Sequence, residues 1–215
     1  MVHKFRVAAG SFNIAADDAL ARHYQFVQPV LRTFAWQPAT ISIGFHQNIS
    51  KINFEKCEND SIDVVRRLTG GGAVLHDNEV TYSVIIPANC SLYDHSTLEI
   101  YNQISLALVE GFRQLNIPIE LGQKNGVGKP VDYSRNFACF ATSAKYEIQF
   151  NGRKVVGSAQ RKFKKALLQH GLSYLETNIY EFLIICFQKT MILGNCKETQ
   201  QVWKRLSKGH FLMMK

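Results

Sequence analysis

The sequence KYEIQFNGRKVVGSAQRK, at residues 145–162, constrains the fold more than any other stretch of this chain. Two runs in which apolar and polar residues alternate flank Asn151 and Gly152. An Asn-Gly pair between such runs is a strong signal for a β-hairpin with a type I′ turn. The stretch therefore predicts two adjacent antiparallel strands, and with them a sheet that is antiparallel at least in part.

Further β-rich runs along the chain predict a sheet of seven or eight strands joined mostly by short turns. The first two runs are separated only by residues 37–39, which suggests that they pair with each other. The run at 62–77 divides into two strands around a glycine turn. The runs lie at residues 30–36, 40–47, 62–77, 79–87, 117–122 and 165–175.

Only a few segments have the pattern of helices. Residues 11–27 are expected to form one, with Ser11 as its cap, and residues 53–59 a short one. Residues 96–116 give the clearest amphipathic helix, because their large apolar side chains recur at helical spacing. Residues 123–137 are polar and rich in turn formers, which predicts an exposed loop. We therefore expect an α+β fold with a largely antiparallel sheet and helices packed to one side.

At 215 residues the chain fits one domain, residues 1–215, in which 176–215 would be a mostly helical tail. Its net charge of +8 favours an acidic partner, either nucleic acid or an acidic carrier protein. There is no apolar run of about 18 residues and no apolar secretory segment, so neither a membrane span nor export is expected. The five widely spaced cysteines predict free thiols in a reducing cytoplasm, and neither a disulfide framework nor a metal site.

The motif RRLTGGGAVLHD, at residues 66–77, contains three consecutive glycines after two arginines. It is not a nucleotide-binding loop of the usual kinds, because no GK[ST] follows and the glycines lead into a β-like run instead of a helix. Gly70, Gly71 and Gly72 could form a tight turn with positive φ angles, or could leave backbone N–H groups open to a carbonyl or phosphate oxygen. Arg66 or Arg67 would then place one guanidinium in the same pocket.

Cys139 and Lys154 form a second candidate constellation. Cys139 lies in or beside the polar loop, and Lys154 follows the hairpin turn. A cysteine is a good nucleophile only as the thiolate, which a nearby ammonium group favours. Taken by themselves, the two residues are more simply explained as a buried thiol and a surface lysine.

The three motifs RRLTGGGAVLHD, GRKVVGSAQRK and LLQHG, in this order and spacing, resemble the biotin/lipoate protein ligase catalytic domain family. The resemblance runs from about residue 11 to residue 175. It implies an α+β fold with a central mixed sheet and a tunnel for a short fatty acyl chain. It also implies a protein substrate, the lysine of a lipoyl domain, carried by glycine cleavage H protein or by the E2 subunit of a 2-oxoacid dehydrogenase.

The resemblance also implies which residues form the site. Lys154 is the lysine of the GRK-x-x-GSA motif, and His76 is expected at the pocket wall, where a structural role is favoured over a catalytic one. The acyl group or its adenylate would lie against the glycine turn. The expected substrate-binding residues are Arg67, Gly70, Gly71, Gly72, Ala73, Val74, Leu75, His76, Gly157, Ser158 and Ala159.

The family contains two chemistries, and Cys139 favours one of them. The ACF segment around Cys139, before the hairpin, is similar to the active-cysteine segment of LipM-type octanoyltransferases. These enzymes take an octanoyl group from acyl carrier protein through a cysteine thioester and need no cofactor. In this chain, Lys154 would lower the pKa of the Cys139 thiol. The alternative is a lipoate protein ligase of the LplA type, which would require ATP and Mg²⁺. A catalytically inactive lipoyl-domain-binding module and a nucleic-acid-binding protein are further alternatives, which the retained site residues and the spacing of the aromatic residues disfavour.

Overall fold

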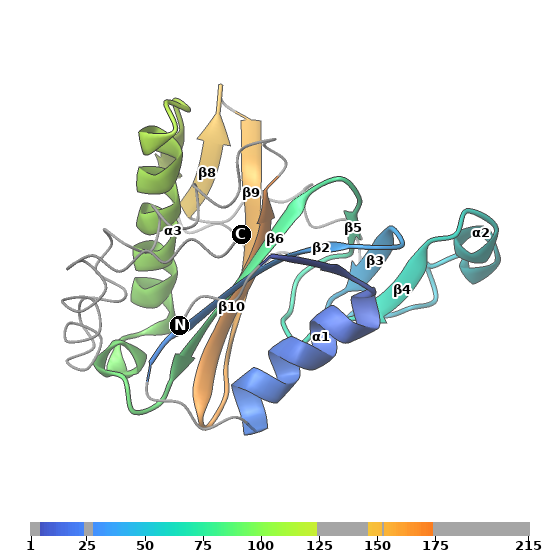
Figure 1. Ribbon diagram of the computed structural model, residues 1–215, viewed down its shortest axis with the longest axis horizontal. Helices are drawn as coiled ribbons and strands as arrows, with labels where there is room; N and C mark the ends of the chain where they lie inside the picture. Colours follow the sequence, from blue (N-terminus) through green and yellow to red (C-terminus); the bar gives the residue numbers. More distant parts are fainter. Residues whose placement is uncertain (1–4, 24–27, 124–145, 152, 174–215) are drawn as a thin grey trace, which may run out of the picture.

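A computed structural model describes residues 5–23, 28–123, 146–151 and 153–173 (Figure 1). The predicted polar loop, Cys139 and the predicted helical tail lie outside these residues, apart from the first residue of the loop. Within the described part, the elements form two sheets with helices on them.

The larger sheet has seven strands among the described residues. Strand β1 is parallel to β2, and every other neighbouring pair is antiparallel. The expected mixed, largely antiparallel sheet is therefore confirmed. In spatial order the strands are β1 (Arg6–Ala8), β2 (Val30–Trp36), β6 (Val80–Pro87), β10 (Ala166–Ser173), β9 (Arg153–Lys162), β8 (Tyr146–Phe150) and β7 (Glu120–Gln123).

The hairpin predicted from the Asn-Gly pair is present. Phe150 pairs with Arg153 across the turn, and β8 and β9 run antiparallel. Asn151 has a φ of 48°, the left-handed conformation that a type I′ turn requires of its first central residue.

A smaller sheet of three described strands corrects two expectations. Its order is β4 (Asp63–Arg66), β3 (Thr40–Ile43) and β5 (Val74–His76). The predicted pairing of residues 30–36 with 40–47 is wrong, because β2 lies in the larger sheet whereas β3 pairs with β4 and β5. The glycine turn does connect two strands, but β3 lies between them, so they do not form a hairpin.

Helices cover both faces of the larger sheet, so the expectation that they pack to one side is wrong. Helix α3 (Thr97–Gln114) shares a buried cluster with Val84 and Ile86 of β6. Helix α1 (Gly10–Asp18) and the π-helical turn that continues it (Ala19–His23) share a different cluster with Ile85. Successive residues of a strand point to opposite faces, so the two clusters lie on opposite sides of β6. Seven of the eight residues of β6 are buried, as expected for a strand covered on both faces.

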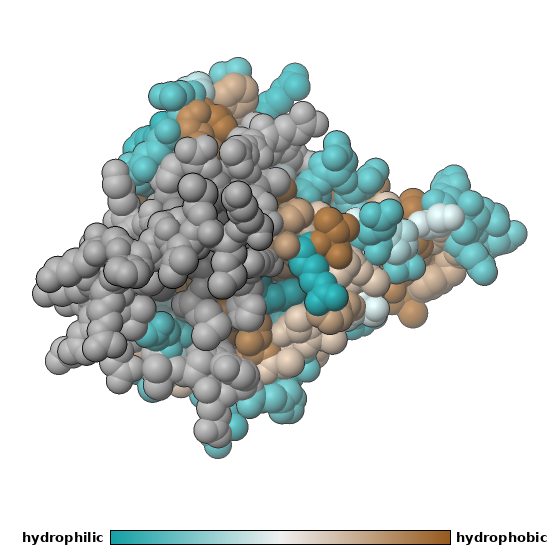
Figure 2. All heavy atoms as spheres, viewed as in Figure 1, coloured by the Kyte–Doolittle hydropathy of each residue, from teal (hydrophilic) through white to brown (hydrophobic). Residues whose placement is uncertain are grey.

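The expected cap Ser11 is wrong, because α1 begins at Gly10 with Ala9 as its N-cap residue, whereas two other helices have side-chain caps. Ser96 and Glu99 form a reciprocal capping box at the start of α3. Asn53 caps α2 (Phe54–Asn59) by accepting a hydrogen bond from the Lys56 N–H, and a 3₁₀ turn (Ser91–Asp94) precedes α3. On the face shown in Figure 2, hydrophilic residues dominate the end of the molecule that carries α2. None of the described helices combines the length and the apolar character needed to cross a bilayer.

Candidate acyl-binding pocket

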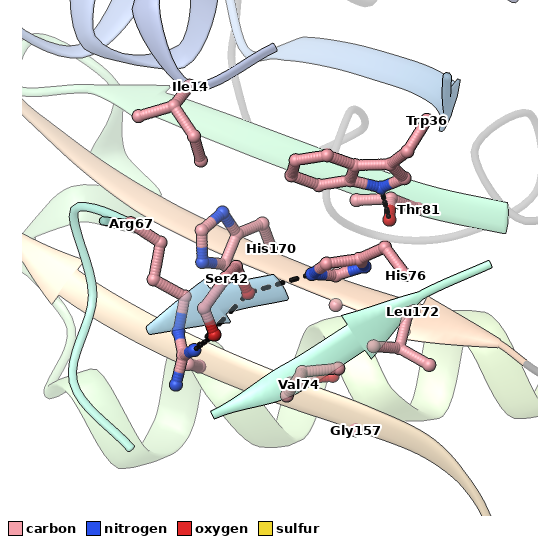
Figure 3. Close-up of a pocket in the computed structure, with 13 residues that line it drawn as sticks. Ile14, Trp36, Ser42, Arg67, Val74, His76, Thr81, Gly157, His170 and Leu172 are labelled. Atoms are coloured by element: carbon pink, nitrogen blue, oxygen red, sulfur yellow. Dashed lines mark hydrogen bonds between the residues drawn. The ribbon is translucent and has the colours of Figure 1, made fainter. Parts of the chain in front are cut away.

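A pocket lies where the two sheets face each other (Figure 3). It encloses about 440 Å³, its open mouth included. Both sheets and helix α1 contribute to its walls, whose exposed surface is mostly apolar. The lining residues are Ile14, Trp36, Ser42, Arg67, Val74, His76, Thr81, Gly157, Ser158, Ala159, His170, Gly171 and Leu172.

Residues from all three sequence motifs meet in this pocket, and the first two motifs supply the ones that were expected there. From the first motif come Arg67, Val74 and His76, and from the second come Gly157, Ser158 and Ala159. The other expected substrate-binding residues, Gly70, Gly71, Gly72, Ala73 and Leu75, do not line it. Leu75 is 47% exposed, since residues on either side of it in β5 point inward and the side chains of a strand alternate.

Seven lining residues were not among those expected. His170, Gly171 and Leu172 belong to or follow the LLQHG motif, which therefore held a signal for them. Their strand β10 pairs with β9, which places His170 opposite Ala159 and Gly171 opposite Ser158. The other four unexpected residues are brought to the pocket by the packing of elements far apart in the sequence. They are Ile14, Trp36, Ser42 and Thr81.

Arg67, buried to 5% exposure, holds the glycine turn in place. Its Nη2 donates to the carbonyl oxygens of Gly70 and Gly72 at 2.8 and 2.7 Å. Its Nη1 donates to the carbonyl oxygen and the hydroxyl of Ser42 at 2.9 and 3.3 Å. The buried guanidinium therefore joins the turn to strand β3. Its hydrogen bonds are strong for their kind, because the donor is charged.

The structure explains Gly71 by backbone geometry. Its φ of 99° is a conformation that side chains with a Cβ rarely adopt. Its carbonyl oxygen also lies where a Cβ on Gly44 would be, 2.0 Å away, so two glycines are needed for the backbones to approach. The interpretation of this motif as a tight turn is therefore sufficient for Gly71, and contact between the glycines and an acyl group stays a prediction.

His76 is at the centre of a buried hydrogen-bond network on one wall. Its Nε2 lies 2.8 Å from Ser42 Oγ, and its Nδ1 lies 2.8 Å from Glu79 Oε1. The Trp36 ring stacks on the imidazole at 4.0 Å between centroids. Burial lowers the pKa of His76 below its usual 6.5, although the hydrogen bond and charge of Glu79 oppose this shift. The ring is therefore neutral at neutral pH.

His170 forms a second network on another wall. Its Nε2 lies 2.7 Å from Thr69 Oγ1, and its Nδ1 lies 3.4 Å from Asp17 Oδ2. The Asp17 carboxylate is fully buried and also accepts hydrogen bonds from Arg32 and Ser83. These bonds compensate the buried charge and anchor helix α1 to the larger sheet.

Lys154 lies on β9, three residues before the pocket-lining Gly157, and is half-buried. The pairing of β9 with β8 is irregular here, because the adjacent residues Ile148 and Gln149 pair with Val156 and Lys154, so the alternation of faces is interrupted between Lys154 and the pocket-lining Ser158. Cys139 lies outside the described residues. Of the other cysteines, Cys57 and Cys90 are buried free thiols, as expected of small apolar side chains. No group of three or more potential metal-binding side chains occurs among the described residues.

The basic cluster at residues 161–165 is partly used within the fold. The Arg161 guanidinium donates to the Leu68 carbonyl oxygen and lies over the rings of Phe45 and Phe163. Lys162 Nζ donates to the Tyr93 carbonyl oxygen at 2.7 Å. At least two of these cations, Arg161 and Lys162, therefore contact other parts of the fold, which fix the positions of their side chains.

Comparison with known proteins identifies relatives over most of the chain. Residues 9–207 match the family described as the lipoyl protein ligase A/B catalytic domain. The octanoyltransferase LipM of Clostridioides difficile (strain 630) is 40% identical over 185 residues, which are 84% of this chain and 67% of the relative. The LipM octanoyltransferase of Bacillus subtilis (strain 168) is 40% identical over 178 residues, 79% of this chain and 63% of the relative. The chain thus spans about two thirds of the length of these curated relatives.

Solved structures support the same fold. The putative lipoate protein ligase Ta0514 of T. acidophilum has a TM-score of 0.66 at 21% identity, over 94% of this chain and 86% of that one. A lipoate-protein ligase A solved with ATP gives a TM-score of 0.67 at 20% identity, with the same two coverages. At these identities the similarity establishes the fold, which agrees with the expected ligase-like α+β architecture.

Proposed function

Because the chain belongs to the lipoyl protein ligase A/B catalytic domain family, we propose that it is an octanoyltransferase of protein lipoylation. It moves an octanoyl group from acyl carrier protein to a lysine of a lipoyl domain. The relatives named octanoyltransferase, 35–40% identical over most of the chain, support this activity over ATP-dependent ligation. We further propose that residues 1–215 form one catalytic domain.

The observation that carries the proposal is the pocket itself. Its apolar wall, made by Ile14, Trp36, Val74 and Leu172, suits a short saturated chain, which has no hydrogen-bonding atoms beyond its carbonyl. Gly157, Ser158 and Ala159 of the second motif line the same space, which supports the proposal.

In the first half-reaction the Cys139 thiolate attacks the carbonyl carbon of the octanoyl thioester on the carrier. A carbon–sulfur bond to Cys139 forms, the bond to the carrier breaks, and the carrier leaves as a thiol after taking a proton. One thioester replaces another at nearly equal free energy, so the step requires no ATP. Lys154 favours the thiolate by its positive charge and then stabilises the negative charge that develops on the carbonyl oxygen.

In the second half-reaction the amine of a lipoyl-domain lysine attacks the acyl-enzyme. The amide bond forms and Cys139 leaves as a thiolate. The lipoyl domain belongs to glycine cleavage H protein or to the E2 subunit of a 2-oxoacid dehydrogenase. The net charge of +8 attracts acidic carrier and lipoyl domains to the pocket mouth and raises their association rates more than their affinities.

The test is the intact mass of the protein after incubation with octanoyl-acyl carrier protein in the absence of ATP. The proposal expects a gain of one octanoyl group that Cys139→Ala abolishes, with the variant still folded by circular dichroism. An octanoyl- or lipoyl-adenylate formed from free acid, ATP and Mg²⁺, without a covalent adduct, would establish the ligase alternative instead. Failure of both reactions would favour an inactive binding module.

The contribution of Lys154 is tested separately by the rate at which Cys139 reacts with iodoacetamide. Lys154→Ala removes the ammonium group and should shift the pH midpoint of alkylation upward, because the thiolate loses a favourable charge. Cys139→Ala supplies the background from the other thiols. An unchanged alkylation profile would contradict the coupling between Lys154 and Cys139.

A further inference from the structure

The indole of Trp36 forms part of the pocket wall, and two neighbouring side chains hold it in place. Its Nε1 donates to Thr81 Oγ1 at 2.8 Å, and its ring stacks on the imidazole of His76 at 4.0 Å between centroids. Figure 3 shows the indole nitrogen directed at Thr81, with the imidazole next to the indole. Trp36 is the last residue of β2 and is half-buried, so burial alone does not fix its side chain.

The two side chains that hold Trp36 are connected to each other by Glu79. The Thr81 hydroxyl donates to Glu79 Oε1 at 2.8 Å, and His76 Nδ1 lies 2.8 Å from the same oxygen. A carboxylate only accepts hydrogen bonds, so the hydroxyl hydrogen of Thr81 faces Glu79 and a lone pair of its oxygen faces the indole N–H. Three hydrogen bonds and one stacking contact therefore close a cycle, the Trp36 network, which consists of Trp36, Thr81, Glu79 and His76.

Burial makes the Trp36 network rigid. Thr81 is 3% exposed, His76 6% and Glu79 7%. Water does not replace a hydrogen bond at such depth, so rotation of the indole away from Thr81 would leave its N–H without an acceptor and would lose the stacking. Buried polar networks whose members are paired restrict the side chains in them to one arrangement. Polar groups behind the wall thus determine the position of an apolar surface in the pocket.

We propose that Thr81 is a positioning residue that holds Trp36 as a fixed wall, and that this wall excludes acyl chains longer than octanoyl. The inference rests on the octanoyltransferase function proposed above. A saturated chain offers no polar group beyond its carbonyl, so the pocket selects among chains by shape. Extra methylene groups are rejected only where the wall cannot move. Thr81 acts through Trp36, and Glu79 orients the hydroxyl with which it does so.

The first test measures which acyl chain the protein accepts. It is incubated briefly with equal amounts of octanoyl- and dodecanoyl-acyl carrier protein, without ATP, and intact mass gives the ratio of the two adducts. The wild type should carry mainly octanoyl. Thr81→Val keeps the size of the side chain but removes the hydroxyl, and it should raise the ratio of dodecanoyl to octanoyl about tenfold, the factor that corresponds to roughly one hydrogen bond.

Matched variants separate this role from a general loss of structure. Thr81→Ser keeps the hydroxyl and should keep the wild-type ratio. Thr33→Val makes the same change at a buried threonine of β2 that does not line this pocket, and it should also keep the ratio. If Thr81→Val does not fold by circular dichroism, Thr81→Ala takes its place, because it puts no methyl group where the hydroxyl was, and Thr33→Ala becomes the control.

The fluorescence of Trp36 gives a readout that is independent of activity. The chain has two tryptophans, so Trp203→Phe leaves Trp36 as the only one. In this background Thr81→Val should lower the fluorescence anisotropy of Trp36 and increase its quenching by acrylamide, because the indole has lost its hydrogen bond. Thr81→Ser should match the Trp203→Phe parent in both measurements.

The outcomes distinguish the inference from the function beneath it. An unchanged adduct ratio in the folded Thr81 variants would overturn the inference, even where acrylamide quenching increases, because a mobile Trp36 would then not admit the longer chain. A wild type that accepts both chains equally would overturn it as well. Absence of any acyl-enzyme in the wild type, with either carrier, would instead refute the octanoyltransferase function, and the fluorescence would still show whether Thr81 holds Trp36.

Discussion

Replacement of Arg67 by alanine should destabilise the protein far more than replacement of its neighbour Arg66. Both guanidinium groups donate to three backbone carbonyl oxygens. Arg67 binds those of Ser42, Gly70 and Gly72. Arg66 binds those of residues 44, 45 and 47. The two side chains differ in burial, since Arg67 is 5% exposed and Arg66 is an exposed residue.

The magnitude follows from this difference. Three hydrogen bonds from a charged donor, at roughly 1.5–3 kcal/mol each, sum to about 5–9 kcal/mol before desolvation of the guanidinium is subtracted. Breaking a buried charged group away from its partners costs about 3–5 kcal/mol net, because the carbonyl oxygens left behind are not reached by water. Water replaces Arg66 at its carbonyls, so Arg66→Ala should cost only about 0–1 kcal/mol, as for exposed ion pairs.

The assay is thermal unfolding followed by circular dichroism, with urea unfolding to give the free energy. For a chain of this length, about 2–4 °C of Tm accompanies each kcal/mol, so Arg67→Ala should lower the Tm by roughly 6–20 °C. Arg66→Ala is the matched control and should lower it by no more than about 4 °C. Equal shifts for the two variants would refute the argument from burial.

Three further outcomes are expected. Gly44→Ala places a Cβ 2.0 Å from the Gly71 carbonyl oxygen, so it should lower the free energy of unfolding by about 1–3 kcal/mol in urea, and an unchanged midpoint would contradict the geometry. The pKa of His76 is lowered from 6.5 in the folded protein, so the unfolded chain binds more protons as the pH falls below 6.5. The free energy of unfolding should therefore decline as the pH falls below 6.5. His76→Gln should remove this part of the decline, measured by urea unfolding at pH 7.5 and pH 5. Ser96→Ala breaks the capping box with Glu99 and should cost about 1 kcal/mol by the same assay, whereas no change would mean that water satisfies the first turn of α3 equally well.

Local structure was predictable from the sequence wherever the signal is local. The Asn-Gly pair predicted the turn between β8 and β9, and Asn151 has the positive φ that this turn requires. The apolar spacing over residues 96–116 predicted the longest described helix, which covers Thr97–Gln114. These predictions held because residues within a few positions of one another determine such geometry.

Part of the candidate pocket was predictable for a different reason. The motifs placed Arg67, Val74 and His76 on one segment and residues 157–159 on another, and the fold brings both segments to one cavity. The sequence did not reveal that Leu75 points outward or that Arg67 donates hydrogen bonds to the carbonyl oxygens of the glycine turn. Both facts depend on which face of a strand meets the second sheet.

The sequence by itself determined the kinds of elements, the largely antiparallel sheet and the family to which the chain belongs. Only the tertiary structure decided that β3 pairs with β4 and β5 and not with β2, and that helices cover both faces of the larger sheet. It alone brought Ser42, His76 and Glu79 into one line of hydrogen bonds. The physical reason is that the period of a strand specifies which residues share a face, but not which distant strand lies beside it. That choice is made by the burial of whole surfaces.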